Sequence, residues 1–429
     1  MRRRVVITGM GVVAPNAIGL PSFEEALRNG RSGIRFIPRL KELNFHCQIG
    51  GVPLGVEERL CAMFSAKELR DVSQSIGYAC VAAMEAYEHA SLKLSIKETD
   101  WDTGAILGCG VSDMQTISER VVPMVNAGKA RRMGSRVVEQ VMNSGNSARV
   151  AGLLGLGNKV SSNSSACSTG TEAIIDGVER IRAGHAKRML VGGSEGASPY
   201  MWGGFDSMRV LSAKYNDAPE AGSRPMSATA CGFVPGAGAG VLVLENLETA
   251  IERGAAILAE IIGVHLNCGG QRNGGSMTAP NASGVKRCIR EAMKDASVSP
   301  AEIDAINGHL TATFADPYEI NNWSQALSRS ASDFPYINAT KSLIGHCIGA
   351  AGAIETIATV VELQNGFLHP SLNCMDLHPE CAPYADKIVR TFLEPEKLEI
   401  IAKASFGFGD VNSCLIMKKW NGRNETNNQ

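Results

Sequence analysis

The chain contains two segments, far apart in the sequence, that follow the same pattern. Each has a helical stretch, an Ala-Ser pair, an acidic linker and an apolar strand that ends in a glycine turn. The helices are Ala82–His89 and Val285–Asp295, and the strands are Ala105–Leu107 and Ile303–Ile306. A chain of 429 residues exceeds what one hydrophobic core usually supports. The repeat therefore predicts two duplicated halves, with a break near Glu248–Gly254.

Apolar strand-like runs alternate with helical stretches along the whole chain, which is typical of an α/β fold. The runs are Val5–Thr8, Ala105–Leu107, Arg188–Val191, Val241–Leu244, Ile257–Val264, Ile303–Ile306 and Ser413–Met417. We expect an N-terminal half over residues 1–250 and a C-terminal half over residues 251–429. Only residues 423–429 have the composition of a disordered tail.

In each half a turn of small residues precedes a helix. The first turn is Ser164–Ser168, which contains Cys167, and the second begins at Ala339–Ser342 and leads to His346. Two stacked halves would bring Cys167 and Lys341–His346 toward a common centre.

Charge and composition exclude several classes of partner. The chain has 42 Lys and Arg against 43 Asp and Glu, a net charge of −1, so neither nucleic acid nor an anionic membrane is an expected partner. No apolar run is long enough to span a bilayer. The basic start Met1–Arg4 leads into an apolar run broken by Gly9, Gly11 and Pro15, which favours a first strand over a targeting signal.

The 12 cysteines are scattered singly, without a Cys-x-x-Cys pair. This usage favours reduced thiols, and hence a cytoplasmic protein.

Cys167 is the candidate nucleophile. It follows Lys159–Ala166, which we interpret as a buried strand, and it opens a helix. The positive end of a helix and its backbone N–H groups stabilise a thiolate. The alternative is that Cys167 is only a small buried residue.

His309 and His346 lie in turns rich in glycine and hydroxyl residues. Functional residues concentrate in such loops, although a structural histidine is the alternative for each. With Cys167 they form a Cys/His/His set. We predict no metal site, because beyond the adjacent Cys347 no further ligand stands at the right spacing.

These residues belong to five motifs in one order along the chain. The motifs are Ser165–Gly170, Asn307–Thr313, Lys341–His346, Gly349–Glu355 and Ser405–Gly409. The set resembles the elongating β-ketoacyl-acyl-carrier-protein synthases, as do the segments Val6–Pro15 and Gly203–Ser212. The resemblance implies a thiolase-like fold, in which two duplicated α-β-α-β-α halves form a five-layered core.

The resemblance also implies an activity, the decarboxylative Claisen condensation of a malonyl thioester with an acyl chain on Cys167. His309 and His346 would bind the malonyl carbonyl and stabilise the enolate. Backbone N–H groups of Cys167 and Phe408 would form an oxyanion hole, and Phe408 would gate the pocket. The substrates would arrive on the phosphopantetheine of an acyl carrier protein, so no cofactor of the chain's own is expected.

Further roles follow from the same resemblance. Lys341 and Glu355 would orient the site as an ion pair, with an ordinary structural bridge as the alternative. Thr311 and Thr313 resemble hydroxyls that bind pantetheine. Val111 aligns with the floor of the acyl pocket, with plain core packing as the alternative.

Several residues depart from the family pattern near these loops. Leu310 replaces a glycine, Phe314 replaces a proline, and Cys231 replaces an aspartate. Asp410-Val411 replaces a Gly-Thr pair. Met226-Ser227 replaces an aromatic-Asp pair. These changes leave the expected reaction class intact. They leave two alternatives for the substrate, which are an ordinary fatty acyl chain and a specialised polyene or polyketide chain.

Asp410 would lie near the thiol and raise the pKa of Cys167, unless it caps a turn instead.

We expect a dimer, either of identical subunits or with a related subunit. The first rival function is a non-catalytic partner subunit that resembles a chain-length factor, and the second is a cysteine hydrolase. A thiolase is nearer in fold, but its second catalytic cysteine is not evident near the C-terminus. Retention of Cys167, His309, His346 and Lys341 favours the condensing enzyme.

Overall fold

A computed structural model describes residues 2–95, 97–111 and 113–422, so the tail predicted over 423–429 lies outside the described residues. The strands of the first half are β1 (Val5–Ala14), β2 (Ala17–Ile18), β3 (Ile34–Phe36), β4 (Ile49–Gly51), β5 (Thr103–Gly108), β6 (Val160–Ser161), β7 (Arg188–Glu195) and β8 (Gly238–Asn246). Those of the second half are β9 (Ala259–Cys268), β10 (Ala305–Asn307), β11 (Tyr336–Asn338), β12 (Ile400–Gly407) and β13 (Val411–Lys419).

Except for β3 and β4, which pair with each other, these strands form an 11-stranded sheet in the order β11-β10-β12-β13-β9-β1-β8-β7-β5-β6, with β2 beside β1. Read from its outer edge, each half has the same order, because β6-β5-β7-β8-β1 corresponds to β11-β10-β12-β13-β9. The halves meet where β1 and β9 pair antiparallel, from Val5 opposite Ile261 to Ile7 opposite Ala259. The duplication predicted from the sequence is therefore present in the strand order.

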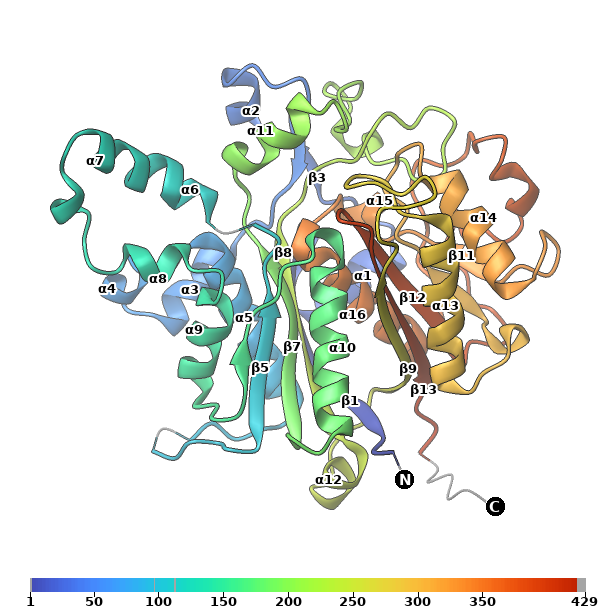
Figure 1. The fold of residues 1–429 in the computed structure, drawn as a ribbon, viewed down its shortest axis with the longest axis horizontal. Helices are drawn as coiled ribbons and strands as arrows, with labels where there is room; N and C mark the ends of the chain where they lie inside the picture. The colour runs from blue at the N-terminus through green and yellow to red at the C-terminus, as the bar shows by residue number, and fades with distance from the viewer. Residues whose placement is uncertain (1, 96, 112, 423–429) are drawn as a thin grey trace.

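Three pairs of helices complete the layers. They are α5 (Gln74–His89) with α9 (Gly145–Leu154), α10 (Thr169–Arg182) with α16 (Ala351–Asn365), and α13 (Ala282–Ala296) with α14 (Asp316–Leu327). The first pair covers the outer face of the N-terminal half and the third that of the C-terminal half, while α10 and α16 lie between the halves (Figure 1). Helix α16 is buried from Ala351 to Leu363. The result is the five-layered α-β-α-β-α arrangement expected for a thiolase-like fold.

Shorter helices decorate this core. They are α1 (Leu20–Arg28), α2 (Pro38–Glu42), α3 (Val56–Met63), α4 (Ala66–Leu69), α6 (Met114–Thr116), α7 (Val122–Asn126), α8 (Val137–Val141), α11 (Pro199–Ser207), α12 (Leu247–Glu252) and α15 (Lys341–Ile344). Helices α6 to α8 project to one side of the N-terminal half (Figure 1). None of the helices in the described part of the chain is long and apolar enough to cross a membrane.

The repeat extends to single backbone angles. Helices α5 and α13 are each followed by a serine in the left-handed region, Ser91 with φ 53° and Ser297 with φ 55°. Ala166 and Ile348 both have φ 48° and begin the 3-10 turns that precede α10 and α16. Gly349, rather than a residue of Lys341–His346, therefore occupies the position equivalent to Cys167.

Helices α10 and α16 approach each other through glycines. A Cβ atom on Gly352 would lie 2.2 Å from Thr171 Oγ1, and one on Gly170 would lie 2.8 Å from the backbone nitrogen of Ala353. Both separations are too short for a side chain. The small residues of Ser165–Gly170 and Gly349–Glu355 are thus what lets the halves touch at the base of the Cys167 turn.

Two strand predictions differ from the structure. The buried strand predicted over Lys159–Ala166 is wrong, because only Val160–Ser161 pairs, at the outer edge of the sheet, and Val160 is 40% exposed. Strand β12 was not among the predicted runs, because Lys403 interrupts its apolar pattern although the side chain is fully buried.

Candidate active site

Cys167 lies at the middle of the 3-10 turn Ala166–Ser168, directly before α10. The thiol is half-buried, and the backbone N–H groups of Phe408 and of Cys167 itself interact with its sulfur. Ser168 fixes the turn against the other half, because its hydroxyl donates to the carbonyls of Ser405 and Val411 at 3.2 and 3.0 Å. The predicted position at the start of a helix is confirmed.

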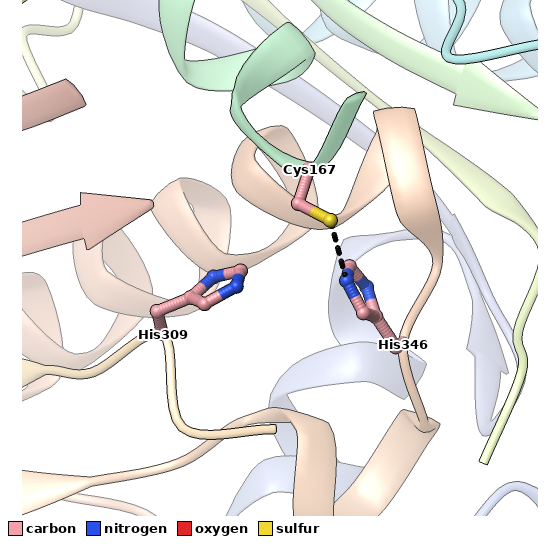
Figure 2. Close-up of side chains that lie close together, drawn as sticks. All are labelled: Cys167, His309 and His346. Carbon is pink, nitrogen blue, oxygen red and sulfur yellow. Dashed lines mark hydrogen bonds between the residues drawn. The ribbon is translucent and has the colours of Figure 1, made fainter. Parts of the chain in front are cut away.

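The two histidines come from separate loops of the C-terminal half. His309 follows β10, and His346 follows α15 after Gly345, which has φ 70°. Their donor atoms and the sulfur of Cys167 all lie within 4.8 Å of one another. Figure 2 shows both rings beside the thiol, with His346 Nε2 3.0 Å from Cys167 Sγ. The structure thus brings together the three residues that the sequence singled out.

Hydrogen bonds fix where each imidazole carries its proton. His346 Nδ1 accepts the backbone N–H of Ile348 at 3.1 Å, so its Nε2 bears the hydrogen. His309 Nδ1 lies 3.4 Å from Lys341 Nζ, which can only donate, so its Nε2 bears the hydrogen as well. Two N–H donors therefore converge on the space beside Cys167, and neither ring is free to act as a base toward the thiol.

The same tautomers disfavour a metal ion at this point. A metal would need the lone pair of Nε2 on both rings, and the bonds to Ile348 and Lys341 place a hydrogen there. Cys167, His309 and His346 are close enough for metal ligands by distance, but their hydrogen bonding suits an anionic oxygen instead.

Burial and neighbouring charge set the protonation states. Burial, and then the charge of Lys341, hold the pKa of both His309 and His346 well below the usual range, so both rings are neutral at physiological pH. Burial raises the pKa of Cys167 to about 11, against the opposing effects of Lys341 and the Phe408 N–H. The predicted thiolate is therefore not the resting form, and the N–H groups act on the negative charge that develops during attack.

Three fully buried charges lie behind His309. The Lys341 ammonium contacts Glu355 Oε1 and donates to the His309 carbonyl oxygen at 2.6 Å. Glu355 Oε2 lies 3.0 Å from the ammonium of Lys403. The ion pair expected between Lys341 and Glu355 is therefore present, and Glu355 does not line the cavity beside Cys167 as a substrate-binding residue would. The ion pair orients His309 through Lys341.

Lys403 is a functional candidate that the sequence analysis missed. Its ammonium contacts Ser405 and donates to Thr171 Oγ1 at 3.1 Å and to the Ala404 carbonyl at 3.0 Å. Its charge also contributes to lowering the pKa of His309 and of His346. The available signal was a lysine inside an apolar run, Ile400–Ser405.

Two buried carboxylates hold the His309 loop and were also missed. Glu319 accepts the backbone N–H groups of His309 and Leu310 at 2.7 and 2.8 Å. Asp316 accepts the N–H of Thr311 at 2.8 Å. Burial raises the pKa of Asp316 to about 6 and that of Glu319 to about 7. Their spacing on the first turn of a helix was visible in the sequence.

A cavity of about 620 Å³ opens beside Cys167 and both histidines. Thr311 and Thr313 line it, with their hydroxyl oxygens 2.9 Å apart, and so does Phe408. Volumes of this size suit a ligand much larger than a short acyl group. These three residues stand where the resemblance places them, and their roles remain predictions.

Other predicted positions fall outside this cavity. Val111 lines a separate cavity of about 20 Å³ and packs in one cluster with Ile348, which does line the larger cavity. Leu310 is fully buried in the core of the C-terminal half, and Cys231 contacts Ser212. Phe314, in contrast, lines the cavity and is 75% exposed at its mouth.

Asp410 does not face the thiol, so the expectation that it raises the pKa of Cys167 is wrong. Its buried carboxylate accepts the N–H groups of Gln271 and Asn281 at 2.9 and 2.8 Å. Its backbone lies in the left-handed region, with φ 64°. The alternative, in which Asp410 caps a turn, is confirmed, because the side chain accepts hydrogen bonds from the backbone of the loop 269–281. Part of this loop lines the cavity.

Models of known protein families match both halves of the chain. The model of the β-ketoacyl synthase N-terminal domain matches residues 2–250, and that of the C-terminal domain matches residues 258–375. The chain is 38% identical to 3-oxoacyl-[acyl-carrier-protein] synthase I, chloroplastic, of Arabidopsis thaliana, over 96% of this chain and 86% of that relative. It is 33% identical to 3-oxoacyl-[acyl-carrier-protein] synthase 1 of Escherichia coli, over 97% of this chain and 99% of the relative.

Solved structures give the same assignment. The ishigamide ketosynthase/chain length factor superposes with a TM-score of 0.88 at 29% identity, over 98% of this chain and all of the other. A type II polyketide ketosynthase bound to its acyl-carrier protein, AntDE:AntF, superposes with a TM-score of 0.86 at 28% identity and the same coverage.

The charge of Lys403 can be tested by its replacement with Met, which keeps the length of the side chain. We expect unfolding to become about 1–3 kcal/mol easier, because Thr171 and Ser405 lose a partner. Since the Lys403 charge lowers the pKa of His309 and His346, its loss should raise both. A ring protonates as the pH falls through its pKa, so both rings should titrate at a higher pH in NMR spectra.

Lys397→Met is the control for this variant, because its ammonium binds Asp304 at the surface. It should leave both titrations unchanged. Identical titrations in the Lys403 variant and the wild type would show that Lys403 only packs the strand.

Asp410→Gly tests whether this carboxylate holds the loop. The N–H groups of Gln271 and Asn281 would lose their acceptor, at a cost of about 1–3 kcal/mol for the buried N–H of Asn281. Amide hydrogen exchange over residues 269–281 should therefore speed up by about tenfold or more. The pH dependence of Cys167 alkylation should stay as in the wild type, and a shift to lower pH would contradict the assignment. Asp410→Asn, which keeps one acceptor oxygen, should be intermediate.

Proposed function

This chain belongs to the β-ketoacyl synthase family, and we propose that it condenses a malonyl thioester with an acyl group held on Cys167. The observation that carries the proposal is the pair of Nε2 hydrogens, of His309 and His346, that converge beside the thiol. They supply two fixed donors for one developing oxyanion, separate from the N–H groups of Cys167 and Phe408.

The first step loads the nucleophile. The Cys167 sulfur attacks the carbonyl carbon of an acyl thioester, and the backbone N–H groups of Cys167 and Phe408 stabilise the oxyanion that forms. The carrier thiol leaves with the proton that the Cys167 thiol loses. An acyl-Cys167 thioester remains.

The second step forms the new carbon–carbon bond. His309 and His346 donate from Nε2 to the thioester carbonyl oxygen of the malonyl group. Loss of carbon dioxide leaves an enolate whose charge these donors stabilise. Because both rings are neutral, their N–H groups are weak acids that donate hydrogen bonds to the enolate without protonating it. The enolate carbon attacks acyl-Cys167, the Cys167 thiolate departs, and the chain leaves two carbons longer on its carrier.

Both rival functions fit the site less well. A cysteine hydrolase needs a base for water, and the hydrogen on both Nε2 atoms leaves none. A non-catalytic chain-length factor has no need of the Cys167 elbow with its two converging donors. The presence of all these groups supports a catalytic subunit.

The substrates we propose are carried on the phosphopantetheine of an acyl carrier protein, which is part of the substrate and not a cofactor of the chain. Relatives named 3-oxoacyl-[acyl-carrier-protein] synthase support a fatty acyl chain, and the polyketide ketosynthases support a specialised one. The exposed Phe314 at the cavity mouth is the departure from the family pattern that bears most directly on this choice.

We further propose that two identical subunits associate through the outer edge of the N-terminal half. Strand β6 ends the sheet there, with Val160 40% exposed, and unpaired edges readily accept another strand. Helix α9 packs on β6, and α8 packs on α9. On α8, Val138 is 57% exposed.

Sedimentation equilibrium of the purified chain should therefore give twice the mass of the 45.5 kDa protein at micromolar concentration. Val160→Lys should shift this equilibrium toward monomer, while Ile251→Lys, on the separate helix α12, should not. A monomeric wild-type protein would contradict the dimer of identical subunits and would favour association with a related subunit instead.

Substitutions at the site separate the two chemical steps. Cys167→Ala should abolish condensation but retain malonyl decarboxylation, because both histidine donors survive. His346→Ala should still accept an acyl group on Cys167 but decarboxylate about 10²-fold more slowly or worse, the usual effect of losing one oxyanion donor. Acyl loading is read by intact mass and decarboxylation by carbon dioxide release. Condensation near the wild-type rate in Cys167→Ala would refute the nucleophile.

A further inference from the structure

A ring of buried polar side chains joins the two chain segments that carry His309 and Lys341. This polar ring consists of Asn307, Asn338, Thr340, Glu362 and His369, each at most 1% exposed. Asn307 ends β10 two residues before His309, and Thr340 directly precedes Lys341. Asn307 Nδ2 donates to Thr340 Oγ1 at 2.9 Å. One hydrogen bond thus links the starting points of the two segments.

Glu362 fixes the direction of the hydrogen bonds on one side of the polar ring. Its Oε1 atom accepts from Asn338 Nδ2 at 2.6 Å and from the backbone N–H of His369 at 2.9 Å. Asn338 therefore turns Oδ1 toward Asn307, its partner on the neighbouring strand, and accepts from Asn307 Nδ2 at 3.2 Å. The NH₂ group of Asn307 is thus directed at both Asn338 and Thr340.

His369 closes the polar ring from the other side. Its Nδ1 lies 3.0 Å from the carbonyl oxygen of Pro370, which can only accept, so Nδ1 bears the hydrogen. Burial lowers the pKa of His369 to about 4, so the imidazole is neutral at physiological pH and its Nε2 is an acceptor. The Thr340 hydroxyl, 3.0 Å away, therefore donates to Nε2 and keeps its lone pairs for Asn307. The directions set by Glu362 and by His369 agree.

The distance between the two linked segments bears on catalysis because the contact that sets the His309 tautomer is a long one. Lys341 Nζ lies 3.4 Å from His309 Nδ1, at the long end for a hydrogen bond. A small shift of Lys341 away from His309 would break this contact, and the hydrogen of the imidazole could then sit on either nitrogen. A hydrogen on Nδ1 would leave Nε2 without a donor for the oxyanion.

We propose that His369 is a positioning residue for the condensation, and that it acts through Thr340 and Asn307 to keep Lys341 at Nδ1 of His309. This inference rests on the proposed function, which uses Nε2 of His309 as an oxyanion donor. His369 itself does not line the cavity beside Cys167. Its influence on the reaction passes through the tautomer of His309, and that tautomer can be measured.

Two substitutions separate the two nitrogens of His369. In His369→Gln the side-chain amide reaches the position of Nε2, and its oxygen can accept from Thr340. In His369→Asn the shorter amide reaches only the position of Nδ1, so the contact with Pro370 survives and the acceptor for Thr340 is lost. Each variant therefore keeps one of the two contacts of the imidazole, and only His369→Gln keeps the polar ring closed.

The tautomer of His309 is read from its side-chain nitrogen chemical shifts in NMR spectra. We expect the hydrogen on Nε2 in the wild type and in His369→Gln, and a mixture of both tautomers in His369→Asn. For malonyl decarboxylation, kcat should fall about tenfold in His369→Asn and at most about twofold in His369→Gln, with KM within about twofold in both. The fall is smaller than the roughly 10²-fold loss from removing a donor outright, because the His309 imidazole remains.

His89→Asn, on α5 of the other half, is the control. His89 accepts the Met10 N–H and has no link to the polar ring, so this variant should change neither kcat nor the His309 tautomer. Equal tautomers or equal kcat values in His369→Asn and His369→Gln would overturn the inference, since a purely structural histidine would not distinguish them. If His369→Asn fails to fold, Thr340→Val against Thr340→Ser gives the same comparison, because only serine keeps the hydroxyl.

The tautomer measurement separates this inference from the proposed function. A wild type that released no carbon dioxide from a malonyl thioester would refute the function, while mixed tautomers in His369→Asn would keep the positioning of His309 by His369. Turnover by the wild type together with an unchanged tautomer in His369→Asn would refute the positioning role alone.

Discussion

The contact between α10 and α16 is the constraint on which the site depends. Gly170 and Gly352 have no room for a Cβ atom, so the two buried helices approach until backbone meets backbone. Each helix carries at its start a 3-10 turn that begins in the left-handed region, at Ala166 and Ile348. Cys167 lies in the 3-10 turn before α10, and His346 lies in the loop just before the 3-10 turn of α16. The close approach of the two helices therefore places Cys167 next to His346. A nucleophile and its partners from opposite halves thereby share one small space.

A buried excess of positive charge then decides what these groups can do. Lys341 and Lys403 bind the two oxygens of Glu355, so two ammonium groups share this carboxylate beside the histidines. Their positive charge disfavours imidazolium, and the bonds at the two Nδ1 atoms leave both Nε2 atoms as donors. The arrangement suits a reaction that creates an enolate and must not protonate it. It also explains how a thiol with a raised pKa can react, since negative charge is stabilised where it develops.

Carboxylates that accept backbone N–H groups shape the loops around the cavity. Glu319 and Asp316 hold the segment from His309 to Thr311, and Asp410 holds the loop opposite. Each is buried and bonds mainly to backbone, so each fixes where a loop runs rather than reacting. Residues of both loops line the cavity beside Cys167. Its shape is a consequence of these anchors.

The sequence by itself determined the duplication, the α/β class and the identity of Cys167, His309 and His346, because these follow from local patterns: apolar periodicity, glycine turns and short motifs. Tertiary structure alone decided where side chains point. Asp410 turns away from the thiol because its partners, Gln271 and Asn281, come from a loop remote in sequence. From the sequence alone Lys403 would be assigned to the surface. In the structure it is buried in the core, where it forms an ion pair with Glu355 of another element. Orientation depends on non-local partners, and no local pattern encodes them.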